Sequence, residues 1–339
     1  LMILEVNFKK LFFLFVLLNI SCDFEPNYTL LKGSTFGTYY QIKFFEFDEE
    51  NHIIEKEIDS IFNHFNNSLS TYIQSSIISK VNRNEKVIVD DLFDDIFKKS
   101  KLIYKKTGGY FDPSIGKLLD YAGFGPIKNK NLISKDSLNM IFNTVGFENI
   151  EIIDGEVKKL NYESKLDFNA IAKGYAVDVI SEFLISKSIY DFMVDIGGEI
   201  RTSGKNKSKD MFWSIAIENP IPNKTDDNFY KRIKLQNAAI ATSGNYRNFR
   251  IDSVTGKKYV HIINPINGEF EQTNILSVSV ISYSCFVSDA FATAMMAGNL
   301  DNAQKLTLEN DDIESMIIYL DDNDELKSFI SEGFQKFIY

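Results

Sequence analysis

Hydrophobic and polar positions follow two periods along this chain, one typical of strands and one typical of helices. Residues 38–44 alternate like a strand, whereas residues 55–69 and 92–106 repeat their apolar positions at helical spacing. Strand patterns recur further along, over 192–200, 213–218 and 275–281, and in a hairpin that joins 316–320 to 326–330. This mixture predicts an α/β to α+β fold of mixed sheets with helices.

The length of 339 residues permits two lobes, and the charged stretch 128–136 is the best candidate for a surface connection between them. Hydrophobic residues make up 44% of the chain and aromatic ones 14%, enough for a sizeable core. The formal net charge is -10 without a concentrated basic stripe, so no nucleic acid is expected as a partner. Cys22 and Cys285 are the two cysteines, and no Cys and His spacing fits a zinc site.

The first residues indicate a location. Two lysines precede the apolar run 11–18, which leads through Asn-Ile-Ser to Cys22. This pattern is typical of a secretory signal with a lipoprotein cleavage box, and the run is shorter than the roughly 20 apolar residues of a membrane-spanning helix. The alternative is a membrane-anchoring helix with an incidental cysteine.

The lipoprotein interpretation divides the chain into a signal peptide over 1–22, a short tether over 23–33 and a domain over 34–339. Cys22 would become the lipidated first residue of the mature protein. We therefore expect the protein in the bacterial cell envelope, held to a membrane through a lipid anchor, on the periplasmic or another extracytoplasmic face.

Residues 166–178 combine an acid, a cation and small side chains at the start of a predicted helix. Asp167 or Asn169 can cap this helix, so free N–H groups and the positive end of the helix dipole would lie beside Lys173. Such an arrangement suits an anionic ligand such as a phosphate. A capped amphipathic helix with a surface lysine is the ordinary structural alternative.

Residues 284–296 are predicted to form a helix with Asp289 and Thr293 one turn apart on the same face. A carboxylate and a hydroxyl are hard oxygen ligands that suit Mg2+, which completes its shell with water and substrate phosphate. An ordinary helix face with satisfied side chains is the alternative. Residues 193–200 are predicted to be a buried strand broken by a glycine pair, and their spacing is not the GxGxxG fingerprint of a dinucleotide site.

A series of short stretches carries the remaining chemistry, in the order Thr35-Phe36-Gly37-Thr38, Ser70-Thr71-Tyr72, 111–116, 123–125, 166–178, 194–199, 241–247, 261–265 and 288–293. This colinear series resembles the ApbE-type FAD:protein FMN transferases, a family of bacterial flavin-trafficking lipoproteins. The resemblance covers nearly everything after the N-terminal segment and implies two lobes around a flavin-binding cleft. Phe36 stands where the family commonly has methionine, and Asn245 and Asn264 stand where aspartates are usual.

The resemblance also implies a metal site and a set of catalytic groups. Magnesium would be held by the side chains of Asp289 and Thr293 and by the backbone carbonyl of Ala170. Asp167 and Lys173 would contact the dinucleotide, with Lys173 and the metal acting on the charge of the transition state. Asp167 would accept hydrogen bonds from a hydroxyl or amino group of the nucleotide.

Residues that align with the flavin or adenine pocket of the family are Phe36, Tyr72 and the segment Asp112-Pro113-Ser114. Aromatic planes suit a flat heterocycle, but each aromatic residue taken alone also fits an ordinary core position.

His261 is the third residue with an expected catalytic role, beside Lys173 and Asp289. It is predicted to share a strand face with Tyr259 and Ile263. The ordinary pKa of histidine suits proton transfer near neutral pH, so His261 is a candidate base or FAD contact, and a structural histidine in a sheet is the alternative.

The activity implied by the resemblance is magnesium-dependent transfer of FMN from FAD to a Thr or Ser hydroxyl of an exported acceptor protein, with release of AMP. FAD is then a substrate rather than a resident cofactor. Two alternatives remain open from the sequence: a FAD pyrophosphatase that yields FMN and AMP, and a non-catalytic FAD-binding lipoprotein. The pair Asp289 and Thr293 argues against the second, since simple binding needs no dedicated metal.

Overall fold

The computed structural model describes residues 28–45, 51–127, 135–221, 228–245, 249–251, 258–270 and 273–339. The predicted signal peptide with Cys22, the first part of the tether, and residues 128–134 of the predicted connection lie outside these ranges. Within them, no helix combines the length and apolar character needed to cross a membrane.

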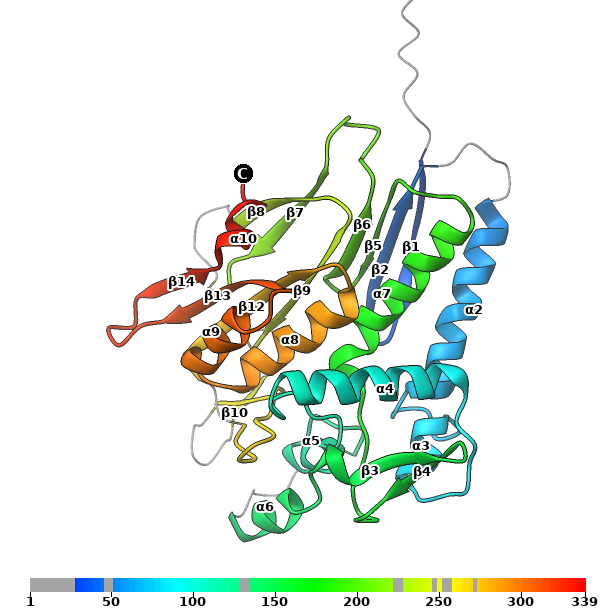
Figure 1. Cartoon of the computed structure of the whole chain (residues 1–339), viewed down its shortest axis with the longest axis vertical. Coiled ribbons are helices and arrows are strands. Elements are labelled where there is room, and N and C mark those ends of the chain that lie inside the picture. Colours follow the sequence, from blue (N-terminus) through cyan, green and yellow to red (C-terminus); the bar gives the residue numbers. More distant parts are fainter. Residues whose placement is uncertain are drawn as a thin grey trace, which may run out of the picture.

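A large sheet forms the centre of the fold (Figure 1). In spatial order its eight strands are β1 (Thr29–Thr35), β2 (Thr38–Phe44), β5 (Phe192–Ile196), β6 (Glu199–Ser203), β9 (Ala238–Gly244), β12 (Ile275–Ser282), β13 (Glu314–Leu320) and β14 (Leu326–Ile330). All neighbouring strands in it run antiparallel, so the prediction of mixed sheets is wrong here. The tight turns that join β1 to β2, β5 to β6 and β13 to β14 force this pairing.

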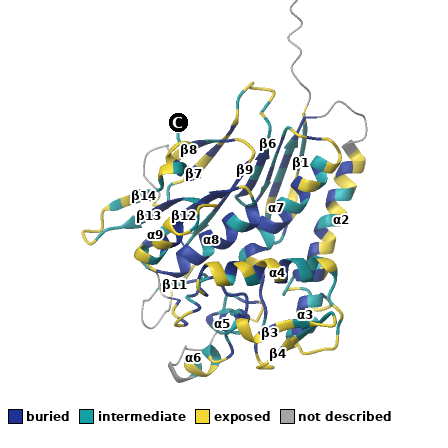
Figure 2. Ribbon diagram, in the orientation of Figure 1, coloured by how far each residue is buried: buried dark blue, intermediate teal, exposed yellow. Residues whose placement is uncertain are grey.

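Helices α7 (Asn169–Ser186) and α8 (Cys285–Ala297) cover one face of the sheet (Figure 1). Figure 2 shows α8 buried along nearly its whole length, as expected for a helix that is apolar on most sides. Outside them, α2 (Asn51–Leu69) packs on α7 and α4 (Asp91–Lys106) packs on α8. The chemistry-bearing ends of α7 and α8 are thereby fixed by packing on both sides.

The opposite face of the sheet carries the hairpin of β7 (Trp213–Glu218) and β8 (Phe229–Leu235). Side chains alternate across each strand, so one set enters the core under the helices and the other enters a second core under this hairpin. The short helix α10 (Glu332–Gln335) closes the second core with the buried Phe334.

Smaller elements surround these layers. They are α3 (Ile77–Asn82), α5 (Gly116–Ala122), α6 (Lys135–Phe142), η2 (Phe147–Asn149), β3 (Ile150–Ile153), β4 (Glu156–Lys159), β10 (Phe249–Ile251), β11 (Lys258–Val260) and α9 (Leu300–Leu308). Figure 1 shows α3, α5, α6, β3 and β4 grouped beyond α4, on the side away from the C-terminal strands.

Most of the predicted elements are confirmed. The strand over 38–44 is β2, the helix over 92–106 is α4 with one more residue at its start, and the hairpin near the C-terminus is β13 and β14. The helix predicted from residue 55 begins at Asn51.

Two predictions are corrected. Residues 192–200 are not one strand, because Gly197 (φ 66°) and Gly198 (φ 103°) adopt left-handed backbone and reverse the chain between β5 and β6. Residues 29–33, assigned to the tether, belong to the sheet, because β1 begins at Thr29 and pairs with β2 throughout.

Candidate active site

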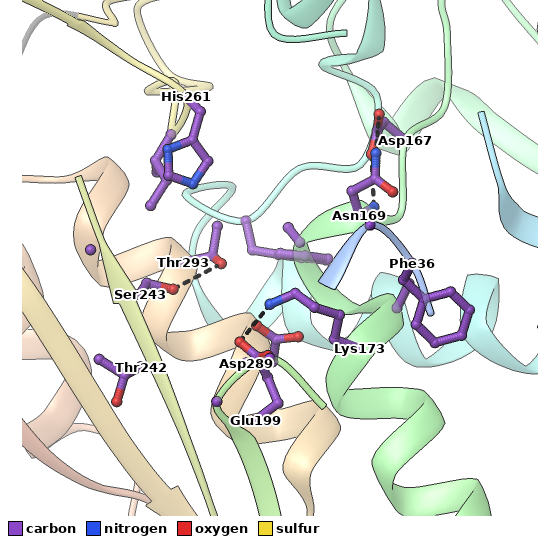
Figure 3. Close-up of a pocket in the computed structure, with 18 of the residues that line it drawn as sticks. Phe36, Asp167, Asn169, Lys173, Glu199, Thr242, Ser243, His261, Asp289 and Thr293 are labelled. Carbon is purple, nitrogen blue, oxygen red and sulfur yellow. Dashed lines mark hydrogen bonds and ion pairs between the residues drawn. The ribbon is translucent and has the colours of Figure 1, made fainter. Parts of the chain in front are cut away.

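A cavity of about 1110 Å³ lies where the start of α7, helix α8, the β5–β6 turn and the end of β9 meet. Most of the side chains predicted from the sequence reach it, and Figure 3 shows how they surround it. The predicted residues that line the cavity are Phe36, Tyr72, Asp112, Pro113, Asp167, Ala170, Lys173, His261, Asp289 and Thr293. The structure therefore brings together residues that lie far apart in the sequence.

The entrance of α7 is built differently from the prediction. The N-cap residue is Phe168, which makes no side-chain cap, so neither Asp167 nor Asn169 is the cap. Asp167 instead accepts hydrogen bonds at Oδ1 from the Asn169 N–H (2.7 Å) and at Oδ2 from the Asn169 amide group (3.0 Å). Burial raises the pKa of Asp167 to about 6. A buried carboxyl with this pKa is ready to accept from a donor on a ligand near neutral pH.

Helices α7 and α8 meet at Gly174. A Cβ atom there would lie 2.5 Å from the carbonyl oxygen of Cys285 and 2.8 Å from Cβ of Asp289, so only glycine fits. The N–H of Gly174 donates to Oδ2 of Asp289 at 3.0 Å. In a regular α-helix this N–H would be directed at the carbonyl of Ala170, four residues earlier. A backbone carbonyl has two lone pairs, so the Ala170 carbonyl can coordinate a ligand while it stays in the helix.

The predicted pair on α8 lies on the cavity wall. Thr293 is one turn after Asp289, and its Oγ1 lies 3.4 Å from Oγ of Ser243 at the end of β9. The pKa of Asp289 is raised to about 7 because it is buried, against the lowering effect of Lys173. Asp289, Thr293 and Ala170 all line the cavity, and a carboxylate, a hydroxyl and a backbone carbonyl are hard oxygens of the kind that Mg2+ prefers.

Among the described residues, no group of three or more His, Cys, Asp or Glu side chains could hold a metal ion. Mg2+ commonly uses one or two protein carboxylates together with substrate phosphate, whereas zinc sites need several nitrogen or sulfur ligands. Cys285 is fully buried beside the site, and burial raises the pKa of its thiol, so it packs as a small apolar side chain.

Lys173 has a partner that the sequence reasoning did not assign. Its Nζ lies 2.5 Å from Oε1 of Glu199, the first residue of β6 (Figure 3). Burial acts to lower the pKa of Lys173, but Glu199 and Asp289 outweigh it and raise the pKa above its ordinary value. Glu199 is 3% exposed, and its Oε2 has no hydrogen-bond partner among the residues that the structure describes. The sequence signals for Glu199 are its place directly after the glycine pair and at the end of the family-like stretch 194–199.

The β5–β6 turn contributes a second missed carboxyl. Asp195 lines the cavity, and its Oδ1 accepts from the N–H of Gly198 at 2.9 Å. Burial raises the pKa of Asp195 to about 6. The β5–β6 hairpin thus brings two acidic side chains, Asp195 and Glu199, to the cavity from opposite faces of the sheet.

The segment 112–114 acts mainly through internal hydrogen bonds. Ser114 is fully buried, and the cavity is lined by its neighbours Asp112, Pro113 and Ile115 rather than by Ser114 itself. Its Oγ donates to Oδ1 of Asp112 (2.6 Å) and accepts from the N–H of Gly146 (2.8 Å). Burial raises the pKa of Asp112. The carbonyl of Pro113 accepts from the N–H of Asp167 at 2.8 Å, which ties this segment to the start of α7.

The aromatic residues lie at different depths. Phe36 occupies the β1–β2 turn with φ 51°, a rare backbone for a bulky residue, and its ring contacts Phe62 and Phe65 at centroid distances of 5.7 and 5.9 Å. Tyr72 is 61% exposed, and its hydroxyl donates to the carbonyl of Phe124 at 3.5 Å. Phe36 is therefore a fixed wall of the cavity, and Tyr72 lies at its edge.

His261 lies across the cavity from Phe36 (Figure 3). It does not share a strand face with Tyr259 and Ile263 as predicted, because β11 ends at Val260. Tyr259 and Ile263 pack instead into a small separate core, whereas the ring of His261 meets Phe124 edge-on at 6.3 Å. The end of the strand turns His261 toward the cavity. Arg247, from the 241–247 motif, lies outside the described residues.

The chain belongs to the ApbE family, whose sequence profile matches residues 36–317. It is 31% identical over 329 residues to a FAD:protein FMN transferase of Vibrio cholerae serotype O1, covering 95% of this chain and 96% of that one. The corresponding enzyme of Haemophilus influenzae is 30% identical, with 93% of each chain covered.

Solved structures share the fold. The flavin transferase ApbE from Vibrio cholerae superimposes with a TM-score of 0.82 at 31% identity, covering 92% of this chain and 99% of that one. The ApbE protein from Thermotoga maritima gives a TM-score of 0.80 at 26% identity, covering 92% and 100%.

Proposed function

We propose that this chain transfers FMN from FAD to a Thr or Ser hydroxyl of an exported acceptor protein. Membership of the ApbE family and the function named for its relatives, FAD:protein FMN transferase, support the reaction class. The bond from Gly174 to Asp289 is the observation in this chain that most directly supports the proposal, because it fixes a carboxylate in the cavity that Thr293 and Ala170 also line. That oxygen set suits a reaction at a pyrophosphate.

The reaction is a displacement at phosphorus. The acceptor hydroxyl attacks the FMN-side phosphorus of FAD and forms a new phosphoester bond. The bond from that phosphorus to the bridging oxygen breaks, and AMP leaves with this oxygen while the hydroxyl gives up its proton. The cavity lined by Phe36 and Tyr72 would hold the flat rings, in a cleft between the main sheet with its helices and the group of small elements around α3 and α5.

The polar residues divide the remaining tasks. Asp289, Thr293 and the Ala170 carbonyl would hold magnesium, which when bound neutralises charge on the pyrophosphate. Lys173 adds a second positive charge, and Glu199 holds its ammonium group at the cavity wall. Asp167 accepts from a hydroxyl or amino group of the nucleotide. His261 accepts the proton of the attacking hydroxyl.

We also propose a location for the protein in the cell, on the basis of its N-terminal segment. A signal peptide over 1–22 and a lipid on Cys22 would hold the domain at a membrane of the bacterial cell envelope, facing the exported acceptor. At this location the enzyme would meet exported proteins, which the proposed reaction requires as acceptors.

The test is to incubate the purified domain with FAD, Mg2+ and candidate exported proteins, following AMP release and protein-bound flavin separately. Transfer predicts equal amounts of both products. AMP release without bound flavin would identify a pyrophosphatase instead. Asp289→Ala should abolish AMP release and keep much of the FAD affinity, because the ring contacts lie elsewhere in the cavity. Full turnover by Asp289→Ala in the presence of a chelator would exclude metal catalysis.

A further inference from the structure

The β7–β8 hairpin has one edge that is closed and one that is open. On the outer edge of β8, the N–H of Lys234 donates to the carbonyl of Phe337 (2.8 Å), and the N–H of Tyr339 donates to the carbonyl of Arg232 (3.3 Å). The C-terminal residues thus cover β8. In the part of the chain that the structure describes, no strand pairs with the outer edge of β7.

The pairing identifies which backbone groups lie on the open edge. In an antiparallel pair, residues alternate between directing both backbone groups toward the partner strand and directing both away. Arg232 and Lys234 direct groups away from β7, toward the C-terminal residues. Their partners across the hairpin are Ala216 and Ser214. These two residues therefore direct their N–H and C=O groups away from β8, onto the open edge.

This edge is part of the wall of the active-site cavity. All five residues 214–218 line it, together with Lys173, Asp289 and Thr293. Successive side chains of a strand point to opposite faces, and those of Ile215 and Ile217 are buried in the core under the hairpin. Five consecutive residues share one cavity only where it runs along the edge of the strand. The cavity thus connects the metal ligands to unpaired backbone groups.

We propose that an extended segment of the flavin-acceptor protein pairs with the open edge of β7 as a third strand and so delivers its Thr or Ser hydroxyl to the cavity. This inference rests on the proposed transfer function. An acceptor polypeptide is the substrate that brings alternating N–H and C=O groups at the spacing of a strand, about 7 Å for every second residue. Backbone pairing of this kind contributes affinity without requiring a particular acceptor sequence.

Ala216→Pro tests the pairing. It removes an N–H from the open edge without removing a hydrogen bond to β8, because Ala216 is a position that points away from β8. The probe is a purified exported protein that the wild-type enzyme labels covalently with flavin. We expect the rate of flavin transfer at subsaturating acceptor protein to be about tenfold lower, because one hydrogen bond to that protein is lost. The effect should appear as a higher KM for the acceptor protein, and the affinity for FAD should not change.

Ser328→Pro is the matched control. Ser328 lies on β14, the edge strand at the far end of the sheet, and outside the cavity. Its N–H also points outward, because the neighbouring hydrogen-bonded pairs are Asp321 with Glu325 and Ser315 with Ser331. Transfer by Ser328→Pro should equal that of the wild type. Equal transfer by Ala216→Pro and the wild type would overturn the inference.

Backbone hydrogen exchange decides the case in which Ala216→Pro fails to fold or loses FAD. Adding the acceptor to the wild-type enzyme with FAD bound should slow exchange of the amides of Ser214 and Ala216, while the amide of Ser328 keeps its rate. Unchanged exchange at Ser214 and Ala216 with saturating acceptor would overturn the pairing. If the wild-type enzyme labels no candidate protein at all, the proposed transfer function is wrong, and the result does not concern the proposed pairing with β7.

Discussion

The N–H of Gly174 on α7 donates to Oδ2 of Asp289 on α8, with a nitrogen to oxygen distance of 3.0 Å. The bond fixes the carboxylate of Asp289 at the cavity. One glycine thus both allows the two helices to approach and orients one ligand of the proposed metal site.

Gly174→Ala should damage stability and activity together. The new methyl group would lie 2.5 Å from a backbone oxygen, so the helices must separate, at a cost of about 1 to 3 kcal/mol. The expected result is a lower melting temperature, with AMP release reduced far more than FAD binding because Asp289 moves. Ser186→Ala, at the exposed end of the same helix, is the control and should change neither. A Gly174→Ala enzyme with normal turnover would contradict the role of this contact.

Lys173 and Glu199 should be coupled in stability. Lys173→Met leaves Glu199 buried without its counter-charge and should lower the free energy of unfolding by about 2 kcal/mol, less than for a fully buried pair because the lysine is partly exposed. The double variant Lys173→Met/Glu199→Gln removes both charges and should recover much of this loss, but not the transfer of FMN. Denaturant titration of the single and double variants measures the coupling. Strictly additive losses would show that the pair does not act as a unit.

The metal-free domain should become less stable as the pH rises from about 5 to about 7. Burial raises the pKa values of Asp167 and Asp195 to about 6 and that of Asp289 to about 7, so the folded protein holds these protons more tightly than the unfolded chain. The free energy of unfolding then falls as the pH rises through this interval and levels off above it. Melting temperatures between pH 5 and 8 measure the slope. Asp167→Asn should make the fall of melting temperature with pH less steep. An unchanged slope in this variant would contradict the raised pKa of Asp167.

His261→Ala separates two roles for this histidine. If His261 accepts the proton of the incoming hydroxyl, the rate of single-turnover AMP release should fall about 100-fold to 10,000-fold, with a smaller change in FAD affinity. A loss mainly in affinity would instead make it an FAD contact. The control is His64→Ala, since His64 is exposed and pairs with Asp90 away from the cavity. Normal rate and affinity in His261→Ala would leave it only a structural role.

Cys22→Ala tests the lipid anchor. Labelled fatty acid should enter the wild-type protein in cells and be absent from Cys22→Ala, because the thiol of Cys22 is the predicted attachment point. Cys285→Ala should keep the label, since Cys285 is buried in the folded domain. Equal labelling of Cys22→Ala and the wild type would show that the lipoprotein interpretation is wrong.

Local patterns predicted much of the secondary structure. The strand over 38–44 and the helix over 92–106 were predictable because alternation and helical spacing are properties of neighbouring residues. The break at the glycine pair in 193–200 was predicted, but the reversal of the chain there was not, because the positive φ angles that reverse it depend on the pairing of the two strands. The antiparallel order of the sheet likewise depends on which strands meet.

The sequence by itself determined the family resemblance, a minority of the residues that line the cavity, and the spacing of Asp289 and Thr293 on one helix face, because these are carried by residue type and short-range order. Only the tertiary structure decided that Lys173 pairs with Glu199, that Ser114 faces inward, and that the edge of β7 opens into the cavity. Each of these depends on contacts between segments far apart in the chain. Such contacts arise from packing across the sheet, which no local pattern encodes.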